Sequence, residues 1–211
     1  TGPLGQGFAN VVGMAIAEAH LAARYNREGQ RVVDHRTWAI VSDGDLMEGV
    51  ASEAASLAGH LQIGKLICLY DDNAVTLSAG TDMTFSEDRA KRFGAYGWQT
   101  IRVEDGNDLE AIDAAIETAC AEATRPTLIL VRTHLGYGSP EQDSFKAHGS
   151  PLGVEDVKKT KETLGWPVEP PFLVPEPARA RFREALGRGA RAHAQWQARM
   201  AAYEDAFADL A

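Results

Sequence analysis

The sequence predicts an α/β fold in which a parallel sheet carries helices on both faces. Four short apolar runs of strand length, each bounded by turn residues, alternate with segments of helical pattern. This alternation is typical of parallel βαβ units, whose strands are buried on both faces. The chain has 211 residues, 45% apolar and 24% charged, which is enough for a globular domain with a full core.

Each element rests on local pattern and composition. The strands are short and rich in β-branched or aromatic residues, whereas the first helical segment is long and rich in Ala and Gly. In chain order, we expect strands at 37–41, 66–70, 98–103 and 127–131, and helices at 8–25, 48–61, 86–96, 109–123, 154–164 and 178–211.

Two segments after the last strand stand apart. Residues 133–151 form a polar, glycine-containing loop that is too long for a plain connector and is therefore expected to be functional. Residues 167–177 contain five prolines in eleven positions and are expected to form a stiff linker. We therefore predict one domain at 1–166, followed at 167–211 by a proline-rich linker and a helical extension.

Composition excludes several partners and locations. A net charge of −9 argues against nucleic acid, whose binding needs clustered basic residues. No apolar run approaches the length of a membrane span. Cys68 and Cys120 lack metal-ligand spacing, and a reduced, buried Cys68 suits a cytoplasmic protein. The chain opens at Thr1 without an initiator Met or a secretion signal, from which we expect further residues upstream.

Polar residues follow two of the predicted strands. Asp43 comes after the first strand and Asn73 after the second. Ligands of open α/β sheets bind beyond the carboxyl ends of the strands, so both side chains are expected to face one crevice. Their oxygens suit Mg²⁺ or Ca²⁺, and Gly44 would let the backbone approach a phosphate. The alternative is purely structural: Asp43 would cap a helix near Glu48, and Asn73 would form a turn.

These residues carry a family resemblance. Ser42-Asp43-Gly44 followed by Asp72-Asn73 resembles the bipartite Gly-Asp-Gly…Asn signature of thiamine-diphosphate enzymes, with Ser42 in place of the first glycine. The resemblance implies that Asp43, Asn73 and the carbonyl oxygen of Val75 bind the metal. It implies thiamine diphosphate and Mg²⁺ (or Ca²⁺) as cofactors.

Further motifs narrow the resemblance to transketolases. The opening segment 1–7, the helix at 48–60 and the loop at 147–153 are similar to transketolase motifs, in the same order along nearly the whole chain. A 1-deoxyxylulose-phosphate synthase or a dehydrogenase E1 component would share the metal motif but not the Gly2-Pro3-Leu4-Gly5-Gln6-Gly7 segment. The resemblance thus indicates the thiamine-diphosphate domain of a transketolase, truncated at both ends.

The resemblance implies roles for further residues. Gly2 and Leu4 would line the thiamine ring site, and Gly44 would face the diphosphate. Glu48 and Glu53 would lie in a hydrogen-bonded path at a dimer interface, although acidic residues also simply suit the start of a helix. His148 would contact the cofactor and the substrate, with a solvated loop histidine as the alternative.

The implied reaction is the transfer of a two-carbon ketol group between sugar phosphates. The glutamate that activates the pyrimidine would belong to a second domain, which this sequence lacks. We therefore expect this chain to be inactive alone and to need a complementary transketolase half. The partner implied by the interface glutamates is a second copy, in a homodimer, or that complementary half. Two alternatives from other classes remain: a non-catalytic assembly module of the same fold, and a nucleotide-binding domain that uses the same crevice.

Overall fold

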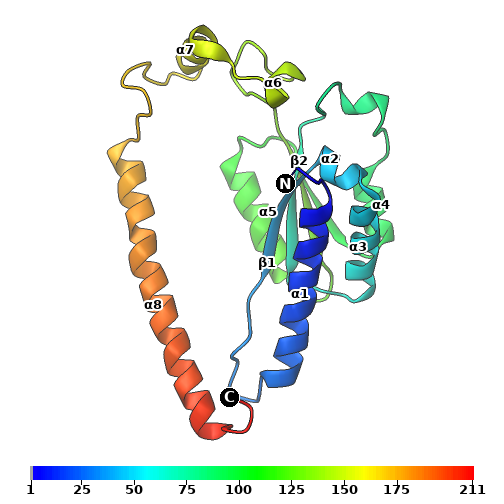
Figure 1. The fold of residues 1–211 in the computed structure, drawn as a ribbon, viewed down its shortest axis with the longest axis vertical. Coiled ribbons are helices and arrows are strands. Elements are labelled where there is room, and N and C mark those ends of the chain that lie inside the picture. Colours follow the sequence, from blue (N-terminus) through cyan, green and yellow to red (C-terminus); the bar gives the residue numbers. More distant parts are fainter. Residues whose placement is uncertain (1) are drawn as a thin grey trace. The chain divides into compact units, whose positions relative to one another are not determined.

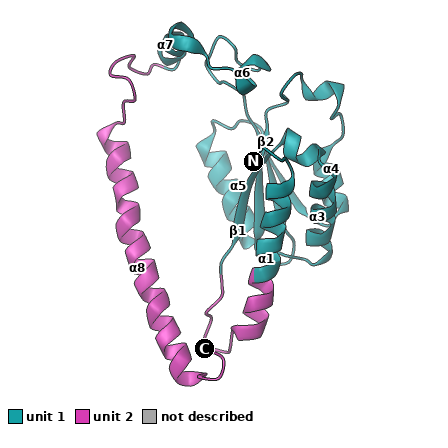
Figure 2. Ribbon diagram, in the orientation of Figure 1, with its two compact units in different colours: residues 1–17, 35–164 teal, residues 18–34, 165–211 magenta. Residues whose placement is uncertain are grey.

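The computed structural model describes residues 2–211, so Thr1 of the first motif lies outside it. The chain divides into two compact units (Figure 2). Unit 1 comprises the residues up to 17 together with 35–164, and unit 2 comprises 18–34 and 165–211. Helix α1 (Gln6–Tyr25) contributes to both.

Unit 1 is built on a four-stranded parallel sheet. Its strands are β1 (Thr37–Ser42), β2 (Leu66–Asp72), β3 (Gln99–Val103) and β4 (Thr127–Arg132). They pair in the order β1-β2-β4-β3, and every pair is parallel. The predicted α/β class and all four predicted strands are therefore confirmed.

Helices cover both faces of this sheet. Helices α3 (Gly49–His60) and α4 (Arg89–Ala95), with the start of α1, pack on one face, and α5 (Leu109–Ala121) packs on the other (Figure 1). The remaining helix of unit 1, α7 (Gly153–Thr163), follows the long loop after β4. These helices occupy the predicted segments.

The pleat of the strands sorts the core into two clusters. On β2, Cys68 and Tyr70 pack toward α1, α3 and α4, whereas Ile67 packs toward α5. On β4, Leu130 and Ile129 divide in the same way. Adjacent residues of a strand point to opposite faces, so an uninterrupted apolar run fills both layers.

The structure adds short elements that the pattern did not predict. Helix α2 (Asp43–Met47) occupies part of the segment expected as a turn before a helix near Glu48. It forms because the Asp45 side chain accepts hydrogen bonds from the Ser42 N–H and hydroxyl, which fixes the first turn. The 3₁₀ helix η1 (Thr81–Met83) and α6 (Lys146–Gly149) also lie in expected loops.

Unit 2 contains the long helix α8 (Glu176–Ala206). The helix begins two residues before its expected start and includes Pro177, because proline fits the first turn of a helix. Within this unit, the Tyr203 hydroxyl donates to the Tyr25 carbonyl oxygen at 2.7 Å. Among residues 2–211, no helix combines the length and the apolarity that crossing a bilayer requires.

Candidate functional site

The pairing of β1 with β2 brings the two predicted ligand segments together. Val41 pairs with Tyr70 and Ser42 with Asp71, so both strands end at the same edge of the sheet. Asp43 begins α2 directly after β1, and Asn73 follows the last residue of β2. The polar residues after these strands therefore meet where ligands bind in parallel sheets.

Asp43 is a buried carboxylate, and one of its two oxygens has no hydrogen-bond partner among the described residues. Its side chain is 1% exposed, and Oδ1 accepts a hydrogen bond from the Tyr70 hydroxyl. Oδ2 is buried and has no hydrogen-bond partner among the described residues. Burial raises the pKa of Asp43 above its ordinary value, against the opposing effect of the Tyr70 hydrogen bond. A buried carboxylate oxygen without a donor is costly unless a cation binds it.

Asn73 is held in a tight turn beside Asp43. Its Oδ1 accepts from the Val75 N–H at 2.9 Å, and its amide nitrogen donates to Asp71 at 3.0 Å. Ala74 adopts the left-handed region with φ 61°, which folds the chain back after β2. Asn73 is buried, so its amide orientation is fixed by protein groups before any ligand arrives.

A cleft of about 290 Å³ opens at this edge of the sheet. Six of the predicted residues line it, among them the polar side chains of Glu48, Asn73 and His148. A mixture of apolar walls and a few polar groups is typical of a small-molecule site. The lining residues are Leu4, Ser42, Gly44, Met47, Glu48, Asn73, Val75, Thr76, Leu77, Ser78 and His148.

A hydrogen bond joins the N-terminal loop to the segment that follows β1. The Gly5 N–H donates to Asp45 Oδ1 at 3.1 Å, and Gly5 has φ +73°. A Cβ on Gly5 would lie 2.6 Å from the Glu48 Cβ, and one on Gly44 would lie 2.9 Å from Leu4 Cδ1. Both glycines therefore allow an approach that a larger residue would block.

His148 lines the same cleft, although it lies far from the other lining residues in the sequence. It lies on α6, in the loop after β4, and its side chain is exposed. Gly149, next to it, lies against Leu77, since a Cβ there would be 3.7 Å from Leu77 Cδ1. The loop predicted to be functional thus contributes its histidine to the wall of the cleft.

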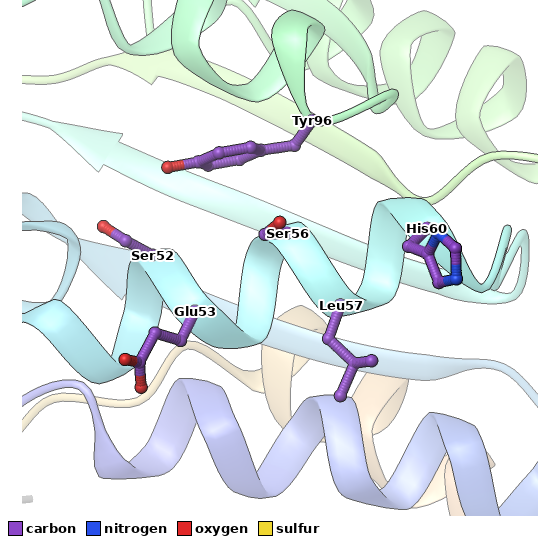
Figure 3. Close-up of a pocket in the computed structure, with 6 residues that line it drawn as sticks. All are labelled: Ser52, Glu53, Ser56, Leu57, His60 and Tyr96. Atoms are coloured by element: carbon purple, nitrogen blue, oxygen red, sulfur yellow. The ribbon is translucent and has the colours of Figure 1, made fainter.

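Three predicted residues are not among those that line the cleft. One is Asp43, which is buried and stands in the chain between the lining residues Ser42 and Gly44. Gly2 is exposed and does not line the cleft. Glu53 lies on the outward face of α3, in an open groove of about 640 Å³ (Figure 3). The groove is larger than the cleft but shallow, and it is lined by Ser52, Glu53, Ser56, Leu57, His60 and Tyr96. We take the cleft as the candidate ligand site, because it lies at the ends of β1 and β2, where Asp43 Oδ2 has no hydrogen-bond partner among the described residues.

The predicted metal ligands include a single carboxylate. Among residues 2–211 there is no cluster of three or more His, Cys, Asp or Glu side chains suited to a metal. The predicted ligands combine the Asp43 carboxylate with the Asn73 amide oxygen and the Val75 carbonyl oxygen. Such a set suits a hard cation that also takes oxygens from a bound phosphate.

Sequence reasoning missed several residues of this site. Met47, Thr76 and Leu77 line the cleft but carry no motif. Tyr70 stands three residues before Asn73, in the segment that carries the motif, but the sequence predicted no role for its side chain. Asp45 follows Gly44 directly, and its spacing from Ser42 matches a capping box.

The whole chain matches a known family model. Residues 1–211 match the family described as "Transketolase, thiamine diphosphate binding domain". The chain is 54% identical to a transketolase from Geobacillus stearothermophilus, covering 100% of this chain and 32% of that protein. It is 48% identical to a chloroplastic transketolase from Zea mays, covering 99% of this chain and 31% of that protein.

Solved structures show the same fold. A transketolase from Leishmania mexicana superposes with a TM-score of 0.96 at 42% identity, covering 100% of this chain and 32% of that one. A transketolase variant from Pichia stipitis gives a TM-score of 0.96 at 41% identity, with coverages of 100% and 31%. The chain therefore spans about a third of the length of the relatives it matches.

Proposed function

The chain belongs to the family of transketolase thiamine-diphosphate-binding domains, and on that premise we propose that it provides the diphosphate and metal anchor of a ketol-transferring enzyme. The proposed reaction moves a two-carbon ketol group from a ketose phosphate to an aldose phosphate. Bound thiamine diphosphate would supply the carbon centre that stores the transferred group. The activity, substrates and partners of the whole enzyme belong to this proposal, because the chain covers about a third of such proteins.

The single observation that carries the proposal is the unsatisfied oxygen of Asp43. Oδ2 is buried and without a partner in residues 2–211, at the edge where Asn73 is already fixed. A divalent cation would compensate the charge of Asp43 and accept ligands from Asn73 and the Val75 carbonyl. Mg²⁺ suits this set, since it prefers oxygen ligands and keeps positions for phosphate oxygens (Ca²⁺ shares these preferences).

The remaining walls of the cleft suit the organic part of the cofactor. Leu4, Met47 and Leu77 provide apolar surface, and Gly44 leaves its backbone open to a diphosphate oxygen. His148, exposed at the rim, is placed to donate a hydrogen bond to a phosphate or a substrate hydroxyl. Gly2 stays a predicted contact of the thiamine ring that lies outside the cleft lining.

A second copy of the chain, or a complementary half, is part of the proposal. Leu57 of α3 is 45% exposed and lines the same groove as Glu53 (Figure 3). Leu61, which caps the end of α3, is 47% exposed. Glu48 at the cleft and Glu53 in the groove lie five residues apart around the start of α3, so a partner on this face would contact both regions. Sedimentation at several concentrations tests association, and Leu57→Glu should weaken it.

The proposal also covers activity and location. We expect no ketol transfer by this chain alone. Within residues 2–211, Glu48 is the one glutamate that lines the cleft, and we propose that it serves the dimer interface and does not activate the cofactor. Turnover by the isolated chain would contradict this. The proposed location is the cytoplasm, where a reducing environment suits the buried Cys68 thiol, whose pKa burial raises to about 12.

Calorimetric titration of thiamine diphosphate tests the proposal directly. The chain is titrated first with Mg²⁺ present and then with EDTA, and Asp43→Ala is titrated in parallel. We expect binding that requires the metal and disappears in the variant. A folded chain that binds no cofactor under any of these conditions would contradict the proposal. Competition with ATP is the control, because displacement by ATP would favour the nucleotide-binding alternative.

A further inference from the structure

Tyr70 connects the metal edge of the sheet to the helix layer beneath it. Its ring is fully buried, and its hydroxyl donates to Asp43 Oδ1. The same hydroxyl lies 3.4 Å from Asp72 Oδ1, because Tyr70 and Asp72 point to the same face of β2. One phenolic proton thus lies near two carboxylates, and its direction determines whether Asp43 Oδ1 is occupied or available.

Arg89 determines that direction. Its guanidinium donates to Asp72 Oδ1 at 2.9 Å, which occupies the competing carboxylate. It also lies over the rings of Tyr70 and Phe85, at 5.6 and 5.3 Å from their centroids, and so holds the phenol in place. With Asp72 paired to Arg89, the Tyr70 proton is directed to Asp43.

We propose that Tyr70 is a positioning residue that makes Asp43 a one-oxygen ligand and thereby favours Mg²⁺ over Ca²⁺ at this site. The inference rests on the proposed function, since it concerns the same metal site. With Oδ1 bound to the Tyr70 hydroxyl, only the unpartnered Oδ2 is left for a cation.

Ligand geometry translates this arrangement into selectivity. Mg²⁺ requires near-octahedral coordination at about 2.0–2.1 Å, which single carboxylate oxygens satisfy. Ca²⁺ takes about six to eight ligands at longer distances and accepts a carboxylate through both oxygens. If the Tyr70 hydroxyl is removed, Asp43 can bind a cation through both oxygens and no longer through Oδ2 alone. Ca²⁺ can use the added oxygen ligand, whereas Mg²⁺ loses the single-oxygen geometry that suits it.

The test compares the affinities of the two cations. Wild-type chain, Tyr70→Phe and Asp43→Asn are titrated with MgCl₂ or CaCl₂ at saturating thiamine diphosphate. For Tyr70→Phe we expect the Mg²⁺ dissociation constant to rise about tenfold, the usual effect of losing a group that orients a metal ligand. We expect the Ca²⁺ constant to change less than about threefold, because the second Asp43 oxygen offsets the loss.

Two further variants separate positioning from general packing. Arg89→Met should shift the selectivity in the same direction, because the unpaired Asp72 then competes for the Tyr70 proton. It keeps the Tyr70 ring and its hydroxyl, so it remains informative if Tyr70→Phe folds poorly. Tyr203→Phe is the matched control, since it removes a buried tyrosine hydroxyl bound to Tyr25 in unit 2, and we expect no change in either affinity.

The outcomes distinguish this inference from the function on which it rests. Equal weakening of both cations in Tyr70→Phe, or no change in their ratio, overturns the positioning role while wild-type binding upholds the proposed function. If Asp43→Asn abolishes binding and the Tyr70 and Arg89 variants leave the ratio unchanged, only the inference fails. If wild-type chain binds neither cation with thiamine diphosphate, the proposed function fails and the inference fails with it.

Discussion

The Gly5 N–H donates to the Asp45 side chain at 3.1 Å, across 40 residues of sequence. The same carboxylate accepts from the Ser42 N–H and from the Ser42 hydroxyl, each at 3.0 Å. One side chain therefore fixes the first turn of α2 and fastens the N-terminal loop beside it. This fastening holds Leu4 against Gly44 at the cleft.

Asp45→Ala should loosen both segments at once. We expect the free energy of unfolding to fall by about 1–3 kcal/mol, because hydrogen bonds to a charged acceptor are lost and their donors are left part-buried. Urea unfolding measures the change. Asp45→Asn is the graded control: it keeps an oxygen that accepts from Gly5 but accepts from neither donor of Ser42, so its loss should be smaller. Equal stability of all three proteins would contradict the assigned role.

Asp43→Asn should separate stability from binding. A buried carboxylate with an unpartnered oxygen destabilises the free chain, whereas a neutral amide of the same shape has a smaller desolvation cost. We expect the cofactor-free variant to be as stable as wild type at pH 7, or more stable by up to about 1 kcal/mol. Metal-dependent binding of thiamine diphosphate should disappear. A clear loss of stability would indicate that Asp43 serves the fold.

Gly59→Ala tests the contact between α3 and the segment before β3. A Cβ on Gly59 would lie 1.8 Å from the Tyr96 carbonyl oxygen, so the backbone would have to move. We expect a loss of about 3 kcal/mol or more. The matched control is Gly13→Ala on α1, where no atom lies within 4 Å and alanine should stabilise the helix by about 0.5–1 kcal/mol. Thermal unfolding of both variants compares them, and similar shifts would contradict the packing argument.

Glu122 gives the fold a pH-dependent contribution. The Thr124 hydroxyl, the Thr124 N–H and the Arg125 guanidinium donate to its carboxylate, which lowers the pKa of Glu122 from 4.5 to about 2. A lowered pKa stabilises the folded chain above pH 4.5, and this contribution is lost as the pH falls toward 2. Glu122→Gln should therefore lower the melting temperature at pH 7.

The difference between wild type and Glu122→Gln should shrink steadily between pH 4.5 and 2. Melting curves collected across this range measure it. Glu117→Gln, on the helix α5 that Glu122 caps, is the control, since it makes the same chemical change at a glutamate without the Thr124 and Arg125 hydrogen bonds. A constant difference at every pH would contradict the role of the Glu122 charge.

The sequence was sufficient to predict the sheet, but only part of the site. The strands could be predicted because apolar runs buried on two faces look the same in any parallel sheet. Asp43 and Asn73 could be predicted because they follow two such strands. Tyr70 could not be connected to Asp43, since their contact depends on the register between β1 and β2. Arg89 could not be connected either, since its contacts depend on how α4 packs on the sheet. Likewise, α6 is a short helix whose formation no periodic pattern announces, although His148 was predicted.

The division of the chain into two compact units could not be predicted from local sequence patterns, because each unit combines segments that are distant in the sequence. Residues 18–34 belong to the same compact unit as α8, more than 140 residues away in sequence. The composition does change along α1, since residues 6–17 contain no charged side chain and residues 18–34 contain six, but a local change of charge does not show that 18–34 belongs to the same unit as α8. The boundary predicted near residue 166 rests on the prolines after it, and it remains a prediction.

The pairing of Val41 with Tyr70 would make the proposed metal site a measure of how the chain has folded. Neighbouring residues of a strand face opposite ways, so a slip of β1 by one residue would separate Asp43 from the Tyr70 hydroxyl. A misregistered molecule could still be compact, helical and soluble, and spectroscopic measures of secondary structure would count it as native. Metal-dependent binding would not, so the ratio of bound cofactor to total chain measures the fraction of molecules with correctly paired strands.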